Sequence, residues 1–306
     1  MRIGIDLGGT KISAIALDDE GSTLFETRIS TPKNDYHGTI SALRDLVTLT
    51  EASCQQSGSV GIGMPGSISP RTGLVQNANS TWLNGKPFED DLTKALSRDI
   101  RLANDANCFT LSEATDGAAR NQHTVFGVIL GTGCGGALVL DKKLINGPRN
   151  IAGEWGHVPL PWMSADEHPG PSCWCGLKGC METFVSGPAI ARDHERHNGE
   201  FFTAEQLHER ALQNDKNALA SFARHSSRLA RGLAMIVNIY DPDIIVPGGG
   251  LSKMPHLYEQ LPDLVAPFLF SDDKTIHISP PVHGDDGGVR GAAWLWEKDR
   301  QGSPGA

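Results

Sequence analysis

The sequence has little of what marks a membrane, secreted or nucleic-acid-binding protein. It contains no apolar run near the ~20 residues that a membrane-spanning helix needs. Its 27 basic residues are outnumbered by 36 acidic ones, giving a formal charge of -9 that argues against binding to nucleic acid or to anionic membranes. The opening residues, MRIGIDLGGTK, lack the apolar core of a signal peptide. We therefore expect a cytoplasmic protein that binds neither nucleic acid nor membranes.

Cysteine is also scarce, because six residues in a chain of 306 are too few for a disulfide scaffold. Three of them, Cys173, Cys175 and Cys180, are nevertheless close together in the sequence. Glycine is the opposite case: the chain has 35, above the usual ~7%, although no segment is of low complexity. The length suits roughly two domains of about 150 residues each. The glycines and the clustered cysteines are therefore the features that need an explanation.

The hydrophobic pattern predicts an α/β protein. Apolar or alternating runs predict strands over 2–7, 11–17, 23–30, 60–64, 100–103, 125–130, 137–140, 243–246 and 275–278. Helical spacing predicts helices over 36–57, 88–96, 105–117, 204–213, 218–240, 258–270 and 288–298. Short turns separate the first strands, which predicts an antiparallel meander. The order strand, glycine turn, strand returns after Thr124 and predicts a duplicated fold. We expect an elaborated loop over 147–182 and a frayed tail over 301–306.

The first glycine turn, DLGGTK, follows a predicted buried strand. Gly8 and Gly9 permit close backbone approach, so that amide groups can point at phosphate oxygens. Thr10 and Lys11 add a hydroxyl and a cation beside them. Asp6, at the end of the strand, can hold Mg²⁺ directly or through water. The alternative interpretation is an ordinary hairpin turn with an incidental aspartate.

Two more glycine turns follow predicted buried strands, GTGCGG at 131–136 and GGG at 248–250. A tight turn alone explains either one, but their recurrence at strand ends favours a cleft that holds a polyphosphate. The residues that we expect at this phosphate, besides the first turn, are Gly131, Thr132, Gly133, Gly135, Gly136, Gly249 and Gly250.

Taken together, the motifs resemble the ROK family (repressors, open reading frames and sugar kinases). The resemblance covers nearly the whole chain and rests on DLGGTK, GTGCGG, GEWGH and CWCGLKGCMET. NANSTWLNG, LANDANC and VRGAAWLW look most like the bacterial fructokinases, or manno(fructo)kinases, of that family. The resemblance implies the actin-like ATPase fold, in which two duplicated, ribonuclease-H-like α/β domains hold ATP and sugar in the cleft between them.

The resemblance also implies the domain boundaries. We expect an N-terminal α/β domain over 1–117, completed by a C-terminal segment, 288–306, whose helix returns to pack on it. The C-terminal α/β domain would cover 118–287 and carry a zinc-binding loop over 153–182.

LANDANC places Asn104 and Asp105 where a predicted strand meets a predicted helix. An aspartate at a helix N-terminus is favoured by the helix dipole, which keeps it ionised. Such a carboxylate can accept the proton of a sugar hydroxyl as that hydroxyl attacks the γ-phosphate. An ordinary N-cap is the alternative interpretation of Asp105. The resemblance implies that Asp105 is the catalytic base and that Asn104 binds a neighbouring sugar hydroxyl.

The rest of the sugar site is implied by the resemblance. It comprises Glu154, His157 and Glu182, with Gly66 and Asn79 as further candidates on the opposite wall. Carboxylates and a ring nitrogen suit vicinal hydroxyls, because each hydroxyl both donates and accepts a hydrogen bond.

One imidazole and three thiols make up the Cys₃His set typical of a closed structural zinc site. The four residues are His157, Cys173, Cys175 and Cys180. Their spacing is tighter than in a common zinc finger, but Gly176 and Gly179 permit the sharp turns required. Free core cysteines are the alternative. The resemblance implies that zinc binds here, with the second nitrogen of the histidine directed at the sugar.

The leading hypothesis is an ATP-dependent hexokinase that binds Mg²⁺ and converts D-fructose to fructose 6-phosphate, a specificity implied by the resemblance alone. Domain closure would exclude water and so prevent hydrolysis of ATP. A kinase of the same family that acts on glucose, mannose or N-acetylglucosamine is the main alternative, because these sugars would meet the same side chains. A sugar-responsive regulator is disfavoured by the acidic charge and by a phosphate strand that begins at residue 2, leaving no room for a DNA-binding domain. A homodimer is expected, as is usual for the family.

Overall fold

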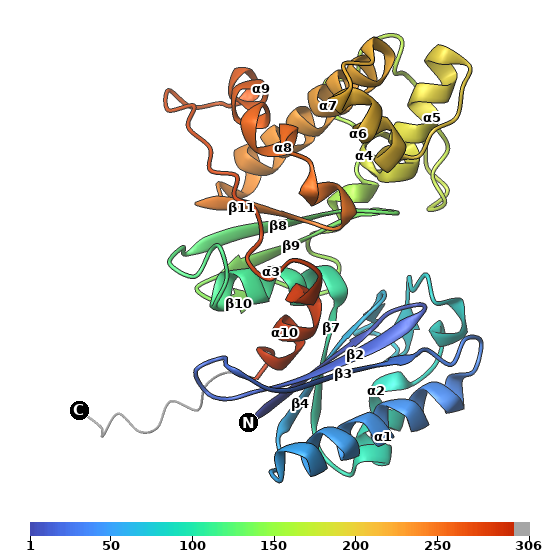
Figure 1. Cartoon of the computed structure of the whole chain (residues 1–306), viewed down its shortest axis with the longest axis vertical. Helices are drawn as coiled ribbons and strands as arrows, with labels where there is room; N and C mark the ends of the chain where they lie inside the picture. The colour runs from blue at the N-terminus through green and yellow to red at the C-terminus, as the bar shows by residue number, and fades with distance from the viewer. Residues whose placement is uncertain (297–306) are drawn as a thin grey trace. The chain divides into compact units, whose positions relative to one another are not determined.

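The computed structural model describes residues 1–296, so the expected end of the last helix at residue 298 and the expected frayed tail lie outside the described residues. Contacts within the chain divide it into two compact units (Figure 1). Unit 1 comprises Met1–Asp116, Asn146–Ile151 and the chain from Asp286 onward. Unit 2 comprises Gly117–Ile145 and Ala152–Asp285.

Unit 1 is built on a five-stranded sheet in the order β3-β2-β1-β4-β7 (Figure 1). Its strands are β1 (Arg2–Leu7), β2 (Lys11–Leu17), β3 (Thr23–Ser30), β4 (Ser59–Met64) and β7 (Ile100–Asn104). The first three pair antiparallel, which confirms the predicted meander, whereas β1, β4 and β7 run parallel. Parallel strands end at the same edge of a sheet, and ligands commonly bind at that edge. The candidate residues Asp6 and Asn104 both lie there.

Helices cover both faces of this sheet. On one face lie α1 (Tyr36–Cys54) and α2 (Phe88–Leu96), and on the other lie α3 (Asp105–Thr115) and α10 (Gly287–Ala293) (Figure 1). The packing of α10 requires glycine: a Cβ atom on Gly61 would lie 1.9 Å from the carbonyl oxygen of Ala292, and one on Gly291 would lie 1.6 Å from that of Cys108. The hairpin β5 (Ser67–Ile68) with β6 (Val75–Gln76) and the 3₁₀ turn η1 (Thr81–Leu83) complete the unit, with η5 (Gly284–Asp286) leading into α10.

Unit 2 repeats this pairing in a sheet of order β10-β9-β8-β11. Its strands are β8 (Thr124–Leu130), β9 (Cys134–Leu140), β10 (Lys143–Leu144) and β11 (Ile244–Gly248). β8 pairs antiparallel with β9 and parallel with β11, as β1 does with β2 and β4. The predicted strand 275–278 is reduced to one parallel bridge from Ile278 to Ile245, in the position that β7 occupies in unit 1. The duplicated α/β fold is therefore confirmed.

The helices of unit 2 follow the loop that carries the cysteines. They are α4 (Glu182–Val185), α5 (Gly187–Asn198), α6 (Ala204–Leu212), α7 (Lys216–Tyr240), α8 (His256–Glu259) and α9 (Leu261–Val265), with 3₁₀ turns η2 (Trp155–His157), η3 (Gly250–Lys253) and η4 (Ala266–Phe268). The prediction of one helix over 258–270 is wrong. Pro262 and Pro267 each lie in the first turn of a new short helix, because proline lacks the N–H that would continue the preceding one. Among the described residues, no helix combines the length and the apolar character needed to cross a bilayer.

Candidate functional site

Two candidate carboxylates of unit 1 lie near each other at the end of the parallel strands. Asp6 is the second-last residue of β1, and Asp105 begins α3. The pKa of Asp6 is raised to about 6 by burial and by the negative charge of Asp105, against the opposing effect of Lys11 and Arg28. A Cβ atom on Gly288, in the first turn of α10, would lie 3.5 Å from the Asp6 carboxyl carbon, which is an ordinary van der Waals distance. The start of α10 therefore lies beside this acidic corner.

The start of α3 fixes the direction of Asp105. Asn104 is the N-cap, and its side-chain oxygen accepts a hydrogen bond from the Ala106 amide at 2.9 Å. The Asp105 carboxylate accepts from the same amide at 2.8 Å. The protein atoms around the carboxyl raise the pKa of Asp105, and the hydrogen bond from the Ala106 amide opposes this. The residue is exposed to solvent. Asp105 is thus an oriented carboxylate that is accessible to a ligand.

The first glycine turn lies beside this corner. The Gly8 amide donates to the Lys11 carbonyl at 3.0 Å, and the Thr31 hydroxyl donates to the Gly8 carbonyl at 2.8 Å. Gly9, Thr10 and Lys11 are exposed. The turn therefore leaves one hydroxyl, one cation and the Gly9 backbone open to an anionic ligand.

Gly66 and Asn79 lie on neighbouring loops of the same unit. Gly66 has a φ of 72°, and a Cβ atom there would lie 2.3 Å from the Gln76 carbonyl oxygen, so glycine is required. Its own carbonyl accepts a hydrogen bond from Asn104 at 3.2 Å. Asn79 is exposed and follows Ala78, which the Asn84 side chain holds through two hydrogen bonds of 2.9 Å.

A pocket of about 360 Å³ opens beside Asn104. Its polar lining includes the side-chain amides of Asn107, Asn146 and Asn150, and its apolar lining includes Met64. Asn107 donates to Asn146 at 3.0 Å. These asparagines were not predicted as site residues from the sequence, because they come from α3 and from the distant segment 146–151.

In unit 2, the second and third glycine turns meet at another pocket. This pocket, of about 390 Å³, is lined by Gly131, Thr132, Gly187, Pro188, Ala191, Phe201, Thr203, Ala204, Glu205, Gly250 and Leu251. A Cβ atom on Gly249, whose φ is 78°, would lie 2.5 Å from the Leu130 carbonyl oxygen. The close approach of Gly249 to the end of β8 thus brings the two turns together.

Gly135 and Gly136 lie elsewhere, on β9 and against Trp155. The Gly135 carbonyl accepts a hydrogen bond from the Trp155 indole at 2.7 Å, and a Cβ atom on Gly136 would lie 2.7 Å from that ring. They pack the GEWGH segment against the sheet and do not line the pocket. Glu154 is exposed at the start of η2, next to this anchor.

Glu182 links the second glycine turn to the cysteine loop. Its Oε2 atom accepts a hydrogen bond from the Cys134 amide at 3.0 Å, and its Oε1 atom accepts from the Trp174 indole at 2.8 Å. A Cβ atom on Gly133 would lie 2.8 Å from the same Oε2 atom. Gly133 therefore leaves space for this carboxylate rather than lining the pocket.

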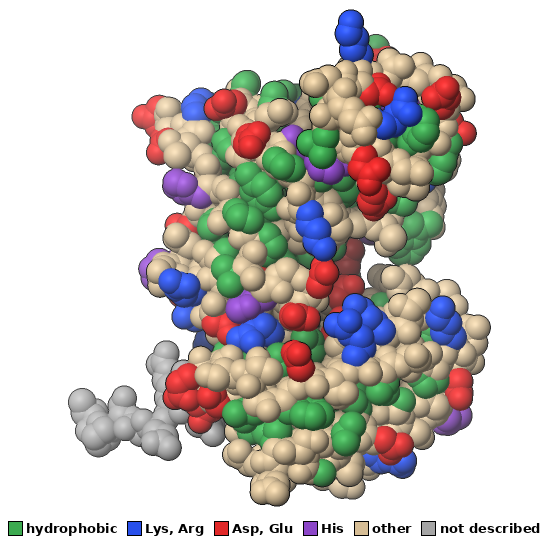
Figure 2. All heavy atoms as spheres, viewed as in Figure 1, with side chains coloured by type: hydrophobic (Ala, Val, Ile, Leu, Met, Phe, Trp, Pro, Cys, Tyr) green, Lys and Arg blue, Asp and Glu red, His purple; other side chains and the backbone are tan. Residues whose placement is uncertain are grey.

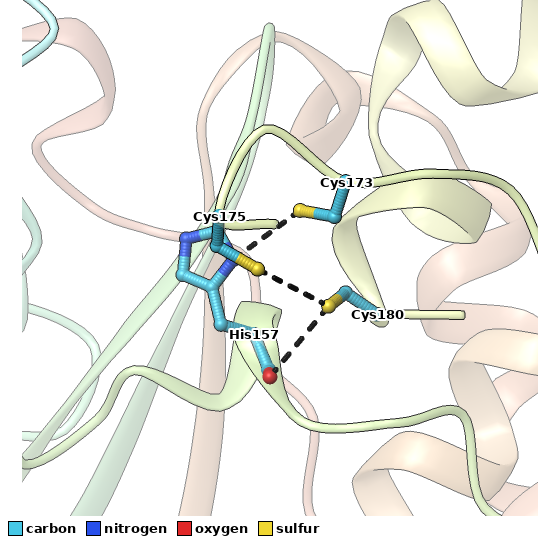
Figure 3. Close-up of side chains that lie close together, drawn as sticks. All are labelled: His157, Cys173, Cys175 and Cys180. Atoms are coloured by element: carbon cyan, nitrogen blue, oxygen red, sulfur yellow. Dashed lines mark hydrogen bonds between the residues drawn. The ribbon is translucent and has the colours of Figure 1, made fainter. Parts of the chain in front are cut away.

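The predicted zinc ligands come together in one cluster (Figure 3). The ligand atoms of His157, Cys173, Cys175 and Cys180 all lie within 4.8 Å of one another. The Cys173 sulfur lies 3.6 Å from His157 Nδ1, and the Cys175 and Cys180 sulfurs are 3.6 Å apart. The donor set and its compactness fit a tetrahedral zinc site.

A buried ion-pair cluster supports the segment between η2 and Cys173. Glu167 accepts hydrogen bonds from Arg228 and Arg231 of α7, all at 2.8 Å. Arg228 also pairs with Asp193 of α5 at 2.7 Å. The side chains of Arg228, Arg231 and Glu167 are at most 8% exposed. On the face shown in Figure 2, by contrast, exposed acidic and basic side chains are mixed.

Comparisons with known proteins identify the family of the chain. The ROK family model matches residues 2–299. N-acetyl-D-glucosamine kinase of Haemophilus influenzae (strain 86-028NP) is 37% identical over 97% of this chain and 99% of that protein. The protein of the same name from Citrobacter koseri is 40% identical over 96% of this chain and 99% of its own length.

Solved structures show the same fold. The ROK hexokinase from Thermus thermophilus has a TM-score of 0.85 and 29% identity, covering 96% of each chain. A ROK family glucokinase from Streptomyces griseus, crystallised with glucose and AMPPNP, has a TM-score of 0.76 and 26% identity, covering 96% of this chain and 98% of that one. The expected actin-like, two-domain α/β fold is confirmed. The chain belongs to the ROK family.

Proposed function

We propose that this protein is an ATP-dependent sugar kinase whose acceptor is N-acetyl-D-glucosamine. The observation that carries the proposal is the similarity, over nearly the full length, to relatives named N-acetyl-D-glucosamine kinase. These relatives favour the alternative considered from the sequence over the expected D-fructose. The carboxylates of unit 1 and the glycine-lined pocket of unit 2 supply the groups that such a reaction needs.

Asp105 is the general base in this proposal. Its carboxylate accepts the proton of a sugar hydroxyl while the hydroxyl oxygen bonds to the γ-phosphorus of ATP and the bond to ADP breaks. Its pKa is raised toward neutral pH, which makes the carboxylate a more effective proton acceptor. Asn104 binds an adjacent hydroxyl in this proposal. Hydrogen bonds with the Ala106 amide and the Gly66 carbonyl already fix the direction of its side chain.

Each unit by itself offers groups that suit part of a nucleotide. Gly131, Thr132 and Gly250 line the unit 2 pocket, which is large enough for a base and ribose. Thr10 and Lys11 of unit 1 offer a hydroxyl and a positive charge for phosphate oxygens. Mg²⁺ suits the carboxylate oxygens of Asp6, and the ion would neutralise charge on the phosphates.

The pocket beside Asn104 suits an acetamido sugar. An acetamido group donates through its N–H, accepts through its carbonyl and carries a methyl group. The side-chain amides of Asn107 and Asn146 match the first two requirements, and the half-buried Ile68 offers an apolar contact for the third.

Zinc would have a structural role at His157, Cys173, Cys175 and Cys180. Bound there, it supplies a fixed cross-link within the cysteine loop. We propose His157 and Glu182 as sugar ligands, and both are in contact with Trp174 of this loop.

A panel of hexoses tests the proposal. The purified protein is assayed with MgATP and with fructose, mannose, glucose or N-acetylglucosamine, and ADP release is coupled to NADH oxidation. We expect the highest kcat/KM for N-acetylglucosamine. A preference for fructose would restore the expectation from the sequence, and no turnover with any sugar would refute the kinase assignment.

A further inference from the structure

We propose that Trp174 is part of the sugar site: its indole N–H orients Glu182, and its exposed ring covers one face of the bound sugar. The inference rests on the proposed function, because it takes Glu182 and His157 as sugar ligands. Trp174 is a positioning residue that was not predicted from the sequence.

Trp174 contacts both of these candidate ligands. Its indole nitrogen donates a hydrogen bond of 2.8 Å to Oε1 of Glu182. Its ring meets the His157 imidazole edge to face, with 4.9 Å between ring centroids and an interplanar angle of 89°. Its backbone is held on either side by Cys173 and Cys175 of the Cys₃His cluster. The indole therefore has a defined position in unit 2.

The contact with Trp174 completes the support of Glu182. The other carboxylate oxygen accepts from the Cys134 amide at 3.0 Å, so a donor fixes each oxygen of the group. A carboxylate oxygen can accept more than one hydrogen bond. Both oxygens consequently remain able to accept from a sugar hydroxyl while their direction is set by the protein.

The exposure of Trp174 is the second observation. Its side chain is anchored at its nitrogen and at its edge, yet the residue is 68% exposed. Trp155 of the same unit also donates its indole N–H but is 3% exposed. A large ring held in place and left uncovered offers apolar area at little entropic cost, and aromatic side chains commonly line ligand sites. The C–H groups on one face of a pyranose provide a matching apolar surface.

Trp174→Phe tests the positioning role, because it keeps an aromatic ring and removes the N–H. We expect KM for N-acetylglucosamine to rise about tenfold, the equivalent of one net hydrogen bond, with kcat changed by less than about threefold and KM for ATP unchanged. Trp162→Phe is the matched control. Trp162 is 54% exposed and packs against Phe268, 5.1 Å away between centroids, and contacts neither Glu182 nor His157 among the contacts found in the described chain.

Zinc content and melting temperature of Trp174→Phe establish whether the cysteine loop is intact. A second measurement needs no variant: acrylamide quenching of tryptophan fluorescence in the wild-type protein, with and without saturating N-acetylglucosamine and without ATP. We expect the sugar to reduce quenching, and we expect most of this protection to disappear in Trp174→Phe and to persist in Trp162→Phe.

The outcomes separate this inference from the proposed function. If the wild-type protein phosphorylates the sugar but Trp174→Phe keeps the wild-type KM and the same protection from acrylamide, the role of Trp174 is refuted and the kinase assignment stands. If the substitution changes only the oligomeric state, the ring serves a protein contact and the inference is also refuted. If the wild-type protein phosphorylates no sugar, the proposed function itself fails.

Discussion

Replacing Glu167 by glutamine should strongly destabilise unit 2. The buried carboxylate of Glu167 accepts three hydrogen bonds of 2.8 Å from Arg228 and Arg231 and one of 3.0 Å from the Ser164 amide. Arg228 keeps Asp193 as a partner, but Arg231 has no other carboxylate among the ion pairs found in residues 1–296. The variant therefore leaves a guanidinium buried without a compensating charge.

Breaking one side of a buried ion pair costs about 3–5 kcal/mol. A domain of this size loses roughly 2–4 °C in melting temperature per kcal/mol, so Glu167→Gln should melt roughly 6–20 °C below the wild type. Asp45→Asn is the matched control. The Arg44–Asp45 pair is equally short, at 2.8 Å, but its side chains are 50% and 68% exposed, so its loss should cost less than about 1 kcal/mol.

Acid titration provides a second test of Glu167. The two arginines help to lower the pKa of its carboxyl to about 2, against 4.5 in the unfolded chain. A lowered pKa in the folded state means that this carboxylate stabilises the fold fully above pH 4.5 and loses its contribution as the pH falls toward 2. Calorimetry across this range should show a smaller acid-induced loss in Glu167→Gln. Equal melting temperatures for the Glu167 and Asp45 variants would refute the argument.

Three further perturbations follow from the packing. Gly61→Ala should lower the free energy of unfolding, measured by urea titration, by about 1–3 kcal/mol, because the new Cβ would lie 1.9 Å from the Ala292 carbonyl oxygen. An unchanged free energy of unfolding would show that α10 does not pack as described. His256 is half-buried, and desolvation lowers its pKa to about 3, so stability should fall as the pH drops below 6.5. His256→Phe should remove roughly 1–2 kcal/mol of the loss between pH 7 and 5 in urea titrations. The same pH dependence of stability in both proteins would contradict this. Cys175→Ser should abolish stoichiometric zinc in metal analysis and lower the melting temperature. Cys54→Ser, outside the cluster, should keep the zinc content and the melting temperature of the wild type. Normal zinc content in Cys175→Ser would count against the site.

The sequence predicted elements whose hydrophobic period is regular. The strand 2–7 and the helix 88–96 agree with β1 and α2, because apolar side chains recur there with the period of each element. The helix α5 was not predicted, because most of its residues are polar. Its signals were Ser186, whose hydroxyl caps the Ala189 amide, and Pro188 in its first turn.

The site was predictable where strand ends bring residues together. Asp6 and Asn104 follow from parallel strands that share an edge. Contacts made by loops could not be predicted from the sequence by this argument. The bond from Trp174 to Glu182 depends on how the cysteine loop turns, and sequence spacing does not specify it. The roles of Gly133 and Gly136 as space for Glu182 and Trp155 likewise depend on tertiary packing.

The most direct test of the account is the turnover of Asp105→Asn with MgATP and N-acetylglucosamine. The helix start should survive the substitution, because the Asn104 side chain independently caps the Ala106 amide. We predict that kcat falls by about 10²–10⁴-fold, as expected for loss of a general base, with the melting temperature within about 2 °C of the wild type. Wild-type phosphorylation of the sugar together with a kcat for Asp105→Asn within about threefold of it would contradict the account.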